Sequence, residues 1–351
     1  MILFLVIIGL ALLILVHEFG HFIAAKLSGA RVIEFGLGFP PRIASKKIGE
    51  TQYSIGIFPL GGFVKIYGET PDDLNKDGRN ADDSFLSKSI FKRSAIILAG
   101  VIMNVFLAWI VFSFIFFIGS KKQVLITEVA ENSPASVAGI KSDDVIRSIS
   151  SRSEKLDAVI ESDAFIEFVK RNSQKEIVIQ ADRGGEELSF TLQGRKNPPE
   201  GEGSLGIVLT GIGIDKKPFF SALYEGGAAT LSTLWMIVNG FIGLFGNMFT
   251  NPDVLKSVAG PVGIFSLATK AGSFGFIYLF EFIALISLNL AVLNFIPFPA
   301  LDGGRFLFLI IEWIRGSAIS MRLQNIINVA GFAALILLVI FATIQDITRL
   351  L

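Results

Sequence analysis

Three ionisable residues lie close together in an otherwise apolar N-terminal stretch of the chain. His17, Glu18 and His21 form an H-E-x-x-H pattern. On a helix, residues four apart project from the same face, so both imidazoles can bind one Zn²⁺ ion. Glu18 lies beside them and can take a proton from a metal-bound water, whose pKa zinc lowers to about 7. The pattern therefore predicts a zinc-activated hydroxide that attacks at neutral pH.

So short a pattern also occurs by chance in many soluble proteins. Here the chain has only 2 His among 351 residues, and both belong to the pattern. Residues 2–25 are apolar apart from these three side chains. Ionisable groups in hydrocarbon are costly unless they pair or bind a metal. We therefore interpret the three residues as a metal site.

The composition is that of a membrane protein. The chain is 52% hydrophobic and 18% charged, and its mean hydropathy is +0.62; these values point to membrane-spanning segments. The formal net charge is zero, which gives no indication of a nucleic-acid partner. Because there is no Cys, disulfides and cysteine zinc ligands are excluded. Any metal must be held by His and carboxylates.

Four apolar stretches predict transmembrane helices. About 24 residues at a rise of roughly 1.5 Å each are enough to cross a bilayer. The first stretch lacks a basic N-terminal region and a small-residue cleavage site, so we expect it to be retained rather than removed as a signal peptide. The four stretches are residues 2–25, 95–118, about 276–296 and about 329–344.

The distribution of basic residues predicts which way the chain crosses. Lysine and arginine follow the first span, beginning with Lys26 and Arg31, and none precedes it. The positive-inside rule therefore predicts an external N-terminus and a cytoplasmic first loop, with the histidines in the cytoplasmic half of the span. Residues 226–250 are also long enough to cross, but their Gly, Ser, Thr and Asn content fits a segment on the membrane or packed on the bundle as well.

A third metal ligand is expected just after the run 276–296. Two prolines break the helix there, and a glycine pair allows a sharp turn that presents Asp302 near a membrane surface. A helix-capping Asp is the alternative. Because no other His and no Cys exist, a carboxylate is the only strong third ligand, and Asp302 reaches the histidines only from the cytoplasmic side. This requires that residues 226–250 do not cross fully.

Residues 31–70 are rich in glycine and carry apolar residues at every second position, which predicts β-hairpins around Pro59-Leu60-Gly61-Gly62. They fit an ordinary cytoplasmic hairpin or, equally, a hairpin beside the zinc whose edge takes up an extended substrate. Residues 71–93 are charged and predict a solvated loop. In the second span, Asn104 is expected to find a polar partner inside the bundle, with a structural role.

Residues 121–212 are charged and rich in predicted strands, which indicates a soluble domain. Ser133-Pro134-Ala135 and the run from Ala138 to Ile146 resemble the sequence pattern of a PDZ domain, with Asp143 where that family usually has Gly. This domain follows the second span and is expected outside the cell. Strands are expected at 124–129, near 177–181 and near 188–192, and a helix at 164–171.

Taken together, these motifs resemble the site-2 protease family of intramembrane zinc metalloproteases, most closely its bacterial RseP-type enzymes. The resemblance covers nearly the whole chain. Besides the PDZ-like domain, its motifs are H-E-F-G-H, F-G-x-G-F-P, P-L-G-G-F-V-K, G-x-x-x-N at 100–104, G-P-x-G-I at 260–264 and N-x-x-P-x-P-x-L-D-G-G at 294–304.

The resemblance implies a role for each matching residue. His17, His21 and Asp302 would ligate zinc, and Glu18 would be the general base. Asn294 would contact substrate near the zinc. The hairpin segment Gly61, Gly62 and Phe63 would belong to a membrane-reentrant β-loop that holds substrate as a strand. The implied substrates are single-pass membrane proteins already cut by another protease, such as anti-sigma factors, or leftover signal peptides.

We therefore expect a polytopic α-helical membrane protein with about four transmembrane helices, a membrane-associated β-hairpin and an inserted PDZ-type α+β domain. The expected location is the bacterial cell (inner) membrane, in contact with lipid, with the active site towards the cytoplasm. The oligomeric state stays open. The expected segments are residues 1–118 (first two helices and hairpin), 119–213 (extracytoplasmic PDZ domain), 214–273 (membrane-associated linker) and 274–351 (last two helices).

Three other functions fit parts of the sequence. A PDZ-bearing membrane scaffold with an inactive metal site is one, although all the residues of a working site are present. A zinc transporter is another, but it would have polar residues spread over several spans, whereas here they cluster at one depth. A membrane-anchored protease that acts on soluble chains is the third.

Overall fold

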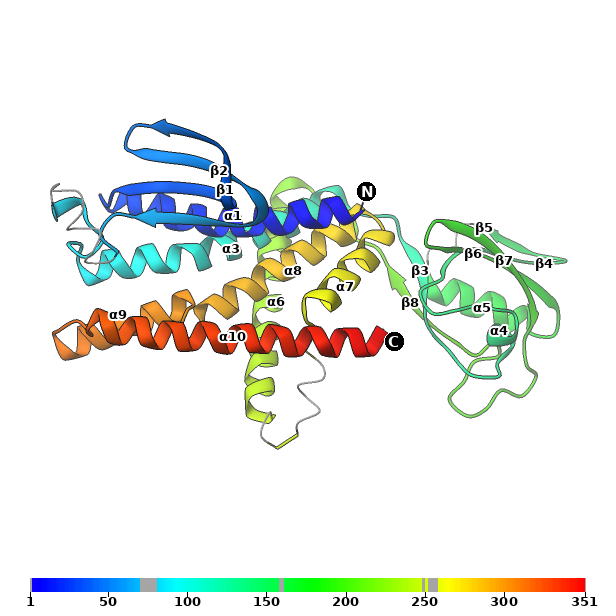
Figure 1. Ribbon diagram of the computed structural model, residues 1–351. Coiled ribbons are helices and arrows are strands. Elements are labelled where there is room, and N and C mark those ends of the chain that lie inside the picture. The colour runs from blue at the N-terminus through cyan, green and yellow to red at the C-terminus, as the bar shows by residue number, and fades with distance from the viewer. Residues whose placement is uncertain (1, 70–80, 158–160, 248–249, 252–257, 351) are drawn as a thin grey trace. The chain divides into compact units, whose positions relative to one another are not determined.

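The computed structural model describes residues 2–69, 81–157, 161–247, 250–251 and 258–350 (Figure 1). The chain forms two compact units. The first unit contains residues 1–113 and 223–351, and the second contains residues 114–222. Each unit is described by itself.

The first unit is a bundle of helices with one small β-sheet. Helix α1 packs against α7 and α8, and α7 also packs against α10. The predicted spans at 2–25, 95–118, 276–296 and 329–344 are all helical, and the last helix is longer at both ends than expected. The helices are α1 (Ile2–Leu27), α3 (Ile90–Ile118), α6 (Phe219–Asn247), α7 (Pro261–Ser273), α8 (Phe276–Phe295), α9 (Asp302–Arg315) and α10 (Met321–Leu350).

Five of these helices are long and apolar enough to cross a bilayer: α1, α3, α6, α8 and α10. This agrees with a polytopic membrane protein. The fifth candidate, α6, corresponds to the stretch that we expected not to cross fully. Its length and composition allow a crossing, so the incomplete crossing stays a prediction.

The predicted hairpin is present as β1 (Val32–Ile48) and β2 (Thr51–Ile66). Both strands are long and bent, so they pair with each other more than once. Residues 32–37 lie between residues 62–66 on one side and 52–55 on the other, and 42–48 pair with 51–56. Segment 62–66 is therefore an outer strand of this small sheet. Apolar contacts among Val32, Ile66, Ala25 and Ile96 pack the hairpin against α1 and α3.

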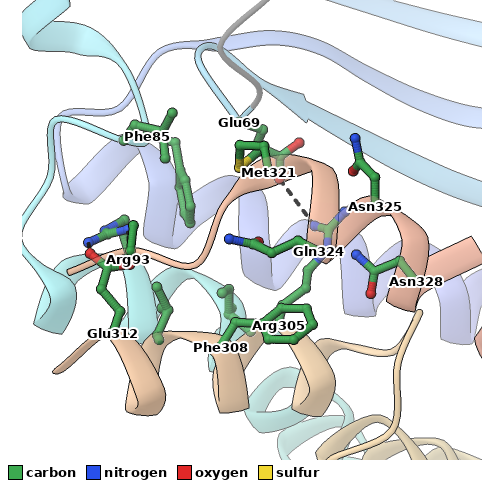
Figure 2. A pocket seen from close by; sticks show the side chains of 14 residues that line it. Glu69, Phe85, Arg93, Arg305, Phe308, Glu312, Met321, Gln324, Asn325 and Asn328 are labelled. Atoms are coloured by element: carbon green, nitrogen blue, oxygen red, sulfur yellow. Dashed lines mark hydrogen bonds and ion pairs between the residues drawn. The ribbon is translucent and has the colours of Figure 1, made fainter. Parts of the chain in front are cut away.

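The charged stretch 71–93 differs in part from the solvated loop that we expected. Residues 70–80 lie outside the described residues. Helix α3 begins at Ile90, and Arg93 is buried, with its guanidinium Nη1 3.1 Å from a carboxylate oxygen of Glu312 on α9 (Figure 2). The prediction of a solvated loop was wrong at Arg93, because composition alone does not reveal an ionic partner some two hundred residues later in the chain.

A tight break separates α8 from α9. The chain turns through Pro297 and Pro299, and Ala300 has a left-handed backbone with φ of 74°. The start of α9 then folds back on this turn: a Cβ at Gly303 would lie 2.2 Å from the carbonyl oxygen of Ile296. Only glycine permits so close an approach. The break therefore presents Asp302 as the first residue of a new helix.

The second unit is a sheet with helices packed on it. The strand order is β7-β6-β4-β3-β8, with β5 paired to β4. Its core is made of apolar side chains such as Ile126, Ile149, Phe165 and Ile179, all buried. The predicted strands and the helix at 164–171 are all present. The elements are β3 (Gln123–Val129), α4 (Pro134–Val137), β4 (Val145–Ser151), β5 (Lys155–Asp157), α5 (Ser162–Asn172), β6 (Glu176–Arg183), β7 (Glu186–Gln193) and β8 (Ile207–Ile212).

Candidate metal centre

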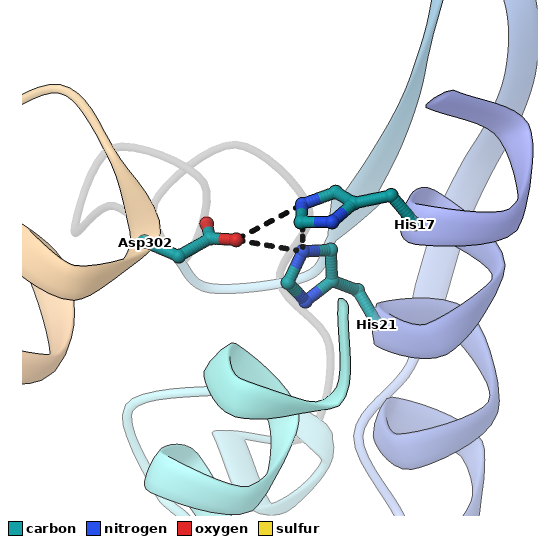
Figure 3. A group of neighbouring side chains, drawn as sticks. All are labelled: His17, His21 and Asp302. Atoms are coloured by element: carbon teal, nitrogen blue, oxygen red, sulfur yellow. Dashed lines mark hydrogen bonds and ion pairs between the residues drawn. The ribbon is translucent and has the colours of Figure 1, made fainter. Parts of the chain in front are cut away.

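His17 and His21 project from one face of α1, as their spacing predicts. Their rings meet edge to face, with 4.8 Å between centroids, and their Nε2 atoms are 3.2 Å apart (Figure 3). Both residues are buried, with relative exposures of 6% and 8%. Two imidazole nitrogens on one face of α1 therefore point into the same small volume. The helix itself is apolar enough to span a membrane.

Asp302 completes the group from the start of α9. Its Oδ2 atom lies 3.0 Å from Nε2 of His17 and 3.3 Å from Nε2 of His21. Among the described residues, these three form a group of potential metal ligands, with one donor atom from each residue and all donor atoms within 4.8 Å of one another. The structure therefore brings Asp302 next to two histidines that lie 285 and 281 positions earlier in the chain.

These donor atoms fit a zinc ion. Oδ2 of Asp302 is buried and faces the Nε2 atoms of both histidines, at 3.0 and 3.3 Å. Oxygen and imidazole nitrogen are both ordinary zinc ligands, and three protein ligands leave one position open, as in catalytic zinc sites. A buried carboxylate is costly unless a cation balances its charge. A divalent metal is the simplest group that satisfies all three side chains.

The charge of the Asp302 carboxyl agrees with this interpretation. Burial by itself would raise the pKa of the carboxyl, but hydrogen bonding and charge interaction with the His17 and His21 imidazoles outweigh burial and lower that pKa below its usual range. The carboxyl is therefore ionised at neutral pH, as a metal ligand must be.

One face of α3 supports the imidazoles from behind. The Nδ1 atom of His21 is 2.8 Å from the carbonyl oxygen of Ile96, and Nδ1 of His17 is 3.2 Å from the side-chain nitrogen of Asn104. Between them lies Gly100, where a Cβ would be 2.5 Å from Nε2 of His21 and 2.7 Å from Cε1 of His17. The imidazoles therefore occupy space that exists only because residue 100 has no side chain.

Glu18 lines a cavity of about 260 Å³ together with His21, Phe63 and Asp302. The β-hairpin passes close to it: a Cβ at Gly62 would be 3.3 Å from Cγ of Glu18. The carboxylate also interacts with the backbone of Val64. Glu18 thus lies between the potential metal ligands and the outer strand of the hairpin.

The remaining residues proposed from sequence are near this cavity to differing degrees. The side-chain nitrogen of Asn294 is 3.4 Å from Nε2 of His17. Phe63 lines the cavity, and its ring covers Gly36, where a Cβ would be 2.4 Å away. Gly61 is buried within β2 and does not line the cavity. Asn294, Gly62 and Phe63 therefore lie at the site, whereas Gly61 does not line it.

A second cavity of about 170 Å³ adjoins the first, because Glu69, Phe85, Ile97 and Arg305 line both. Arg305 forms an ion pair with Glu69, with 3.2 Å between Nη1 and Oε1 (Figure 2). The lining of this cavity also includes the side-chain amides of Gln324, Asn325 and Asn328. The two cavities thus share part of their walls, and the second has a mixed polar and apolar lining.

Sequence reasoning missed the part that α3 plays at the site. It expected a polar partner and a structural role for Asn104. The partner is present as the His17 imidazole, and Gly100 leaves the space that both imidazoles occupy. A signal was present: Gly100 and Asn104 are four residues apart, the same spacing as His17 and His21. Two helices that pack side by side can match such faces along their length.

Proteins with similar sequences include metalloproteases. The sequence pattern of peptidase family M50 matches residues 5–338. A Nostoc sp. protein described as a "Putative zinc metalloprotease" is 36% identical over 97% of this chain and 94% of its own length. "Membrane metalloprotease ARASP, chloroplastic" of Arabidopsis thaliana is 31% identical over 96% of this chain and 76% of its own length. "Regulator of sigma-W protease RasP" of Bacillus subtilis is 28% identical over 96% of each chain.

The family match, the relatives and the apolar helices all lead to the same conclusion. The chain belongs to peptidase family M50, the site-2 protease family, and is a zinc-dependent metalloprotease of the multi-pass membrane type.

Proposed function

We propose that this protein is an intramembrane endopeptidase that cleaves the transmembrane segments of single-pass membrane proteins. His17, His21 and Asp302 hold the zinc ion, and Glu18 is the general base. The observation that carries the proposal is the position of the histidines. They are buried, and they belong to α1, a helix long and apolar enough to span a bilayer. A bond cut at this site lies at membrane depth rather than in water.

Zinc, when bound, supplies a Lewis acid that polarises a carbonyl and a positive charge that makes a water molecule acidic. Glu18 takes the proton of the attacking water and later gives a proton to the leaving amine. Its position in the cavity that His21 and Asp302 also line suits both transfers. The amide of Asn294, 3.4 Å from Nε2 of His17, is close enough to contact the substrate beside the reacting carbonyl.

The substrate must be unwound before it can be cut, because a helix buries its own peptide groups in hydrogen bonds. An extended segment would pair with the outer strand 62–66 of the hairpin, which replaces the lost helical hydrogen bonds by β-addition. The close approach of Gly62 to Glu18 supports this arrangement, because it brings the strand next to the base. Phe63 provides an apolar contact for the bound strand.

The proposed substrates are single-pass proteins that another protease has already shortened, with anti-sigma factors and signal-peptide remnants as the two classes. The name of the Bacillus subtilis relative, "Regulator of sigma-W protease RasP", supports the first class. We place the protein in the bacterial cell (inner) membrane, with the metal site towards the cytoplasm. The basic residues that follow α1, beginning with Lys26 and Arg31, favour that orientation.

We further propose that residues 119–213 form an extracytoplasmic PDZ-type domain. The mixed order of its strands and its two helices supports this. Asp143 adopts a left-handed backbone with φ of 73°, which accounts for the glycine usual at this point of the PDZ pattern. Asp and Asn tolerate this conformation better than most residues.

The test compares purified wild-type protein with Glu18→Gln, using a single-pass model substrate in detergent. The proposal expects that the wild type cuts and that Glu18→Gln keeps its zinc but does not cut. Mass spectrometry of the products should place the cut inside the apolar segment. Glu281→Gln, which makes the same change in another candidate span, is the matched control and should cut normally.

Three outcomes would contradict the proposal. Cleavage only in the soluble tails of the substrate would make the protein an anchored protease for soluble chains. Full activity of Glu18→Gln would show that Glu18 is not the general base. If the wild type holds no zinc after loading, the proposed zinc ligands are wrong.

A further inference from the structure

Asn104 is a fully buried polar residue beside the candidate metal centre, and its side-chain contacts are incomplete. Its relative exposure is 0%. Its side-chain nitrogen lies 3.2 Å from Nδ1 of His17, while its side-chain oxygen, Oδ1, has no hydrogen-bond partner among the described residues. The Ser287 hydroxyl donates to the backbone carbonyl of Asn104, which holds α3 and α8 together at this level. The Asn104 amide therefore contacts His17 through its nitrogen, while its oxygen has no partner among the described residues.

The contact between Asn104 and His17 is coupled to which ring nitrogen of His17 carries the proton. If the amide nitrogen faces Nδ1, then Nδ1 must accept, and the proton of the neutral ring is on Nε2. Nε2 is the atom that points at Asp302, 3.0 Å away. A protonated Nε2 cannot ligate a metal, because its lone pair is used for the N–H bond.

His21 does not have this ambiguity. Its Nδ1 lies 2.8 Å from the carbonyl oxygen of Ile96, which can only accept. The His21 proton is therefore on Nδ1, and its Nε2 lone pair is free for a metal. The two histidines differ in their partners. Nδ1 of His21 contacts a backbone carbonyl, whereas Nδ1 of His17 contacts a side-chain amide that can present either its nitrogen or its oxygen.

We propose that Asn104 is a positioning residue for the metal: with zinc bound, its side-chain oxygen accepts a hydrogen bond from Nδ1–H of His17 and so keeps the Nε2 lone pair on the metal. The oxygen and nitrogen of an amide are nearly the same size, so a half-turn of the side chain exchanges them without other movement. The half-turn gives Oδ1 a partner at His17 and moves the amide nitrogen to the position that Oδ1 now occupies. This proposal rests on the zinc ligands assigned under the proposed function.

The composition makes a direct spectroscopic test practical. The chain contains 2 His, so protein made with ¹⁵N-labelled histidine and without a polyhistidine tag has only four ring-nitrogen signals. In the zinc-loaded wild type, both rings should carry their proton on Nδ1. On removal of zinc, His17 should change to the form protonated on Nε2, while His21 should keep its proton on Nδ1.

Two variants separate an acceptor role from mere packing. Asn104→Leu fills a similar volume without an acceptor, and zinc affinity should fall about 10–100-fold, the usual effect of losing such an outer partner. Asn104→Asp keeps an acceptor of the same shape, and its zinc affinity should equal or exceed that of the wild type. Asn239→Leu, at an exposed asparagine of α6, is the matched control and should bind zinc normally.

The outcomes are distinguishable from failure of the proposed function. If the wild type binds no zinc, the ligand assignment itself is wrong. If the wild type binds zinc but Asn104→Leu binds equally well, or if the loaded His17 ring carries no proton on Nδ1, Asn104 has no positioning role although the protease function stands. If Asn104→Leu does not fold, the ring-nitrogen signals of the loaded wild type decide by themselves.

Discussion

Around His17 and His21, helix α3 contributes a backbone carbonyl, the bare backbone at Gly100 and one side-chain amide. Ile149 of the second unit is instead packed among apolar side chains. At the metal centre, close packing depends on residues without side chains: a Cβ at Gly20 would be 2.4 Å from the carbonyl oxygen of Ala99, and Gly100 leaves room for both imidazoles. In the second unit, Ile149 and Phe165 are buried in a continuous apolar core.

The difference follows from the solvent of each region. Lipid is as apolar as the side chains of the helices, so burial of apolar surface does not bring spanning helices together. Small residues and polar contacts do so instead, and they also create polar cavities. In water, removal of apolar surface is the main stabilising contribution, which favours a core of large side chains. The same chain thus uses two kinds of packing, and each should fail in its own way.

The largest effect is expected from Gly100→Ala. The new methyl group would overlap Nε2 of His21, 2.5 Å away, and force the imidazoles from their positions. A displacement of about 1 Å costs roughly 100-fold in rate, and we expect activity to fall by about that factor together with zinc affinity. Metal content and cleavage rate measure both. Gly243→Ala is the control, because a Cβ there meets no described atom within 4 Å. Normal zinc binding by Gly100→Ala would show that the helices adjust freely.

The next largest effect is expected from Ile149→Ala in the second unit. The side chain is fully buried, so its loss should destabilise this unit by about 2–5 kcal/mol. Hydrogen exchange in β3, β4 and β6 should speed up accordingly, while zinc content stays constant. Val137→Ala, at an exposed position of α4, should change neither. Loss of zinc from Ile149→Ala would mean that the two kinds of packing are coupled.

A medium effect is expected from Asp346→Asn in α10. This buried carboxylate accepts hydrogen bonds from the backbone nitrogens of Gly260 and Gly263, at 3.1 and 2.7 Å, and so caps the start of α7. Loss of the negative charge at a helix N-terminus should cost about 1–2 kcal/mol. The midpoint of thermal unfolding in detergent measures this loss of stability. Asp157→Asn, at an exposed position, is the control. An unchanged midpoint would mean that polar capping adds little to this bundle.

The smallest effect is expected from Ala300→Gly. Ala300 has a left-handed backbone, which glycine adopts without strain, but glycine also gains freedom in the unfolded chain. We expect stability to change by less than about 1 kcal/mol, with zinc affinity unchanged. Gly303→Ala, three residues later, should by contrast lose zinc, because its Cβ would overlap the carbonyl oxygen of Ile296 and displace Asp302. Equal effects of the two changes would contradict this account of the turn.

Much of the helical bundle and the main residues of the candidate site could be predicted from sequence. Apolar length indicated the spans, because the bilayer thickness sets how long a crossing helix must be. The spacing of His17 and His21 indicated one helix face, and the scarcity of other ligands pointed to Asp302. The hairpin and the strands of the second unit followed from alternation and turn residues.

The remainder could not be predicted, because it depends on contacts between distant parts of the chain. Arg93 was assigned to a solvated loop because its partner, Glu312, lies on another helix. Asn104 was given a structural role because no local pattern places an amide beside an imidazole of α1.

Sequence by itself therefore determined the chemistry and the local elements: which side chains can bind zinc, which segments are helices, and where they break. Only the tertiary structure decided the register of α3 against α1, which puts Ile96, Gly100 and Asn104 behind the two histidines. The physical reason is that register depends on close contacts between backbones and small residues, whose effect appears only when two helices meet.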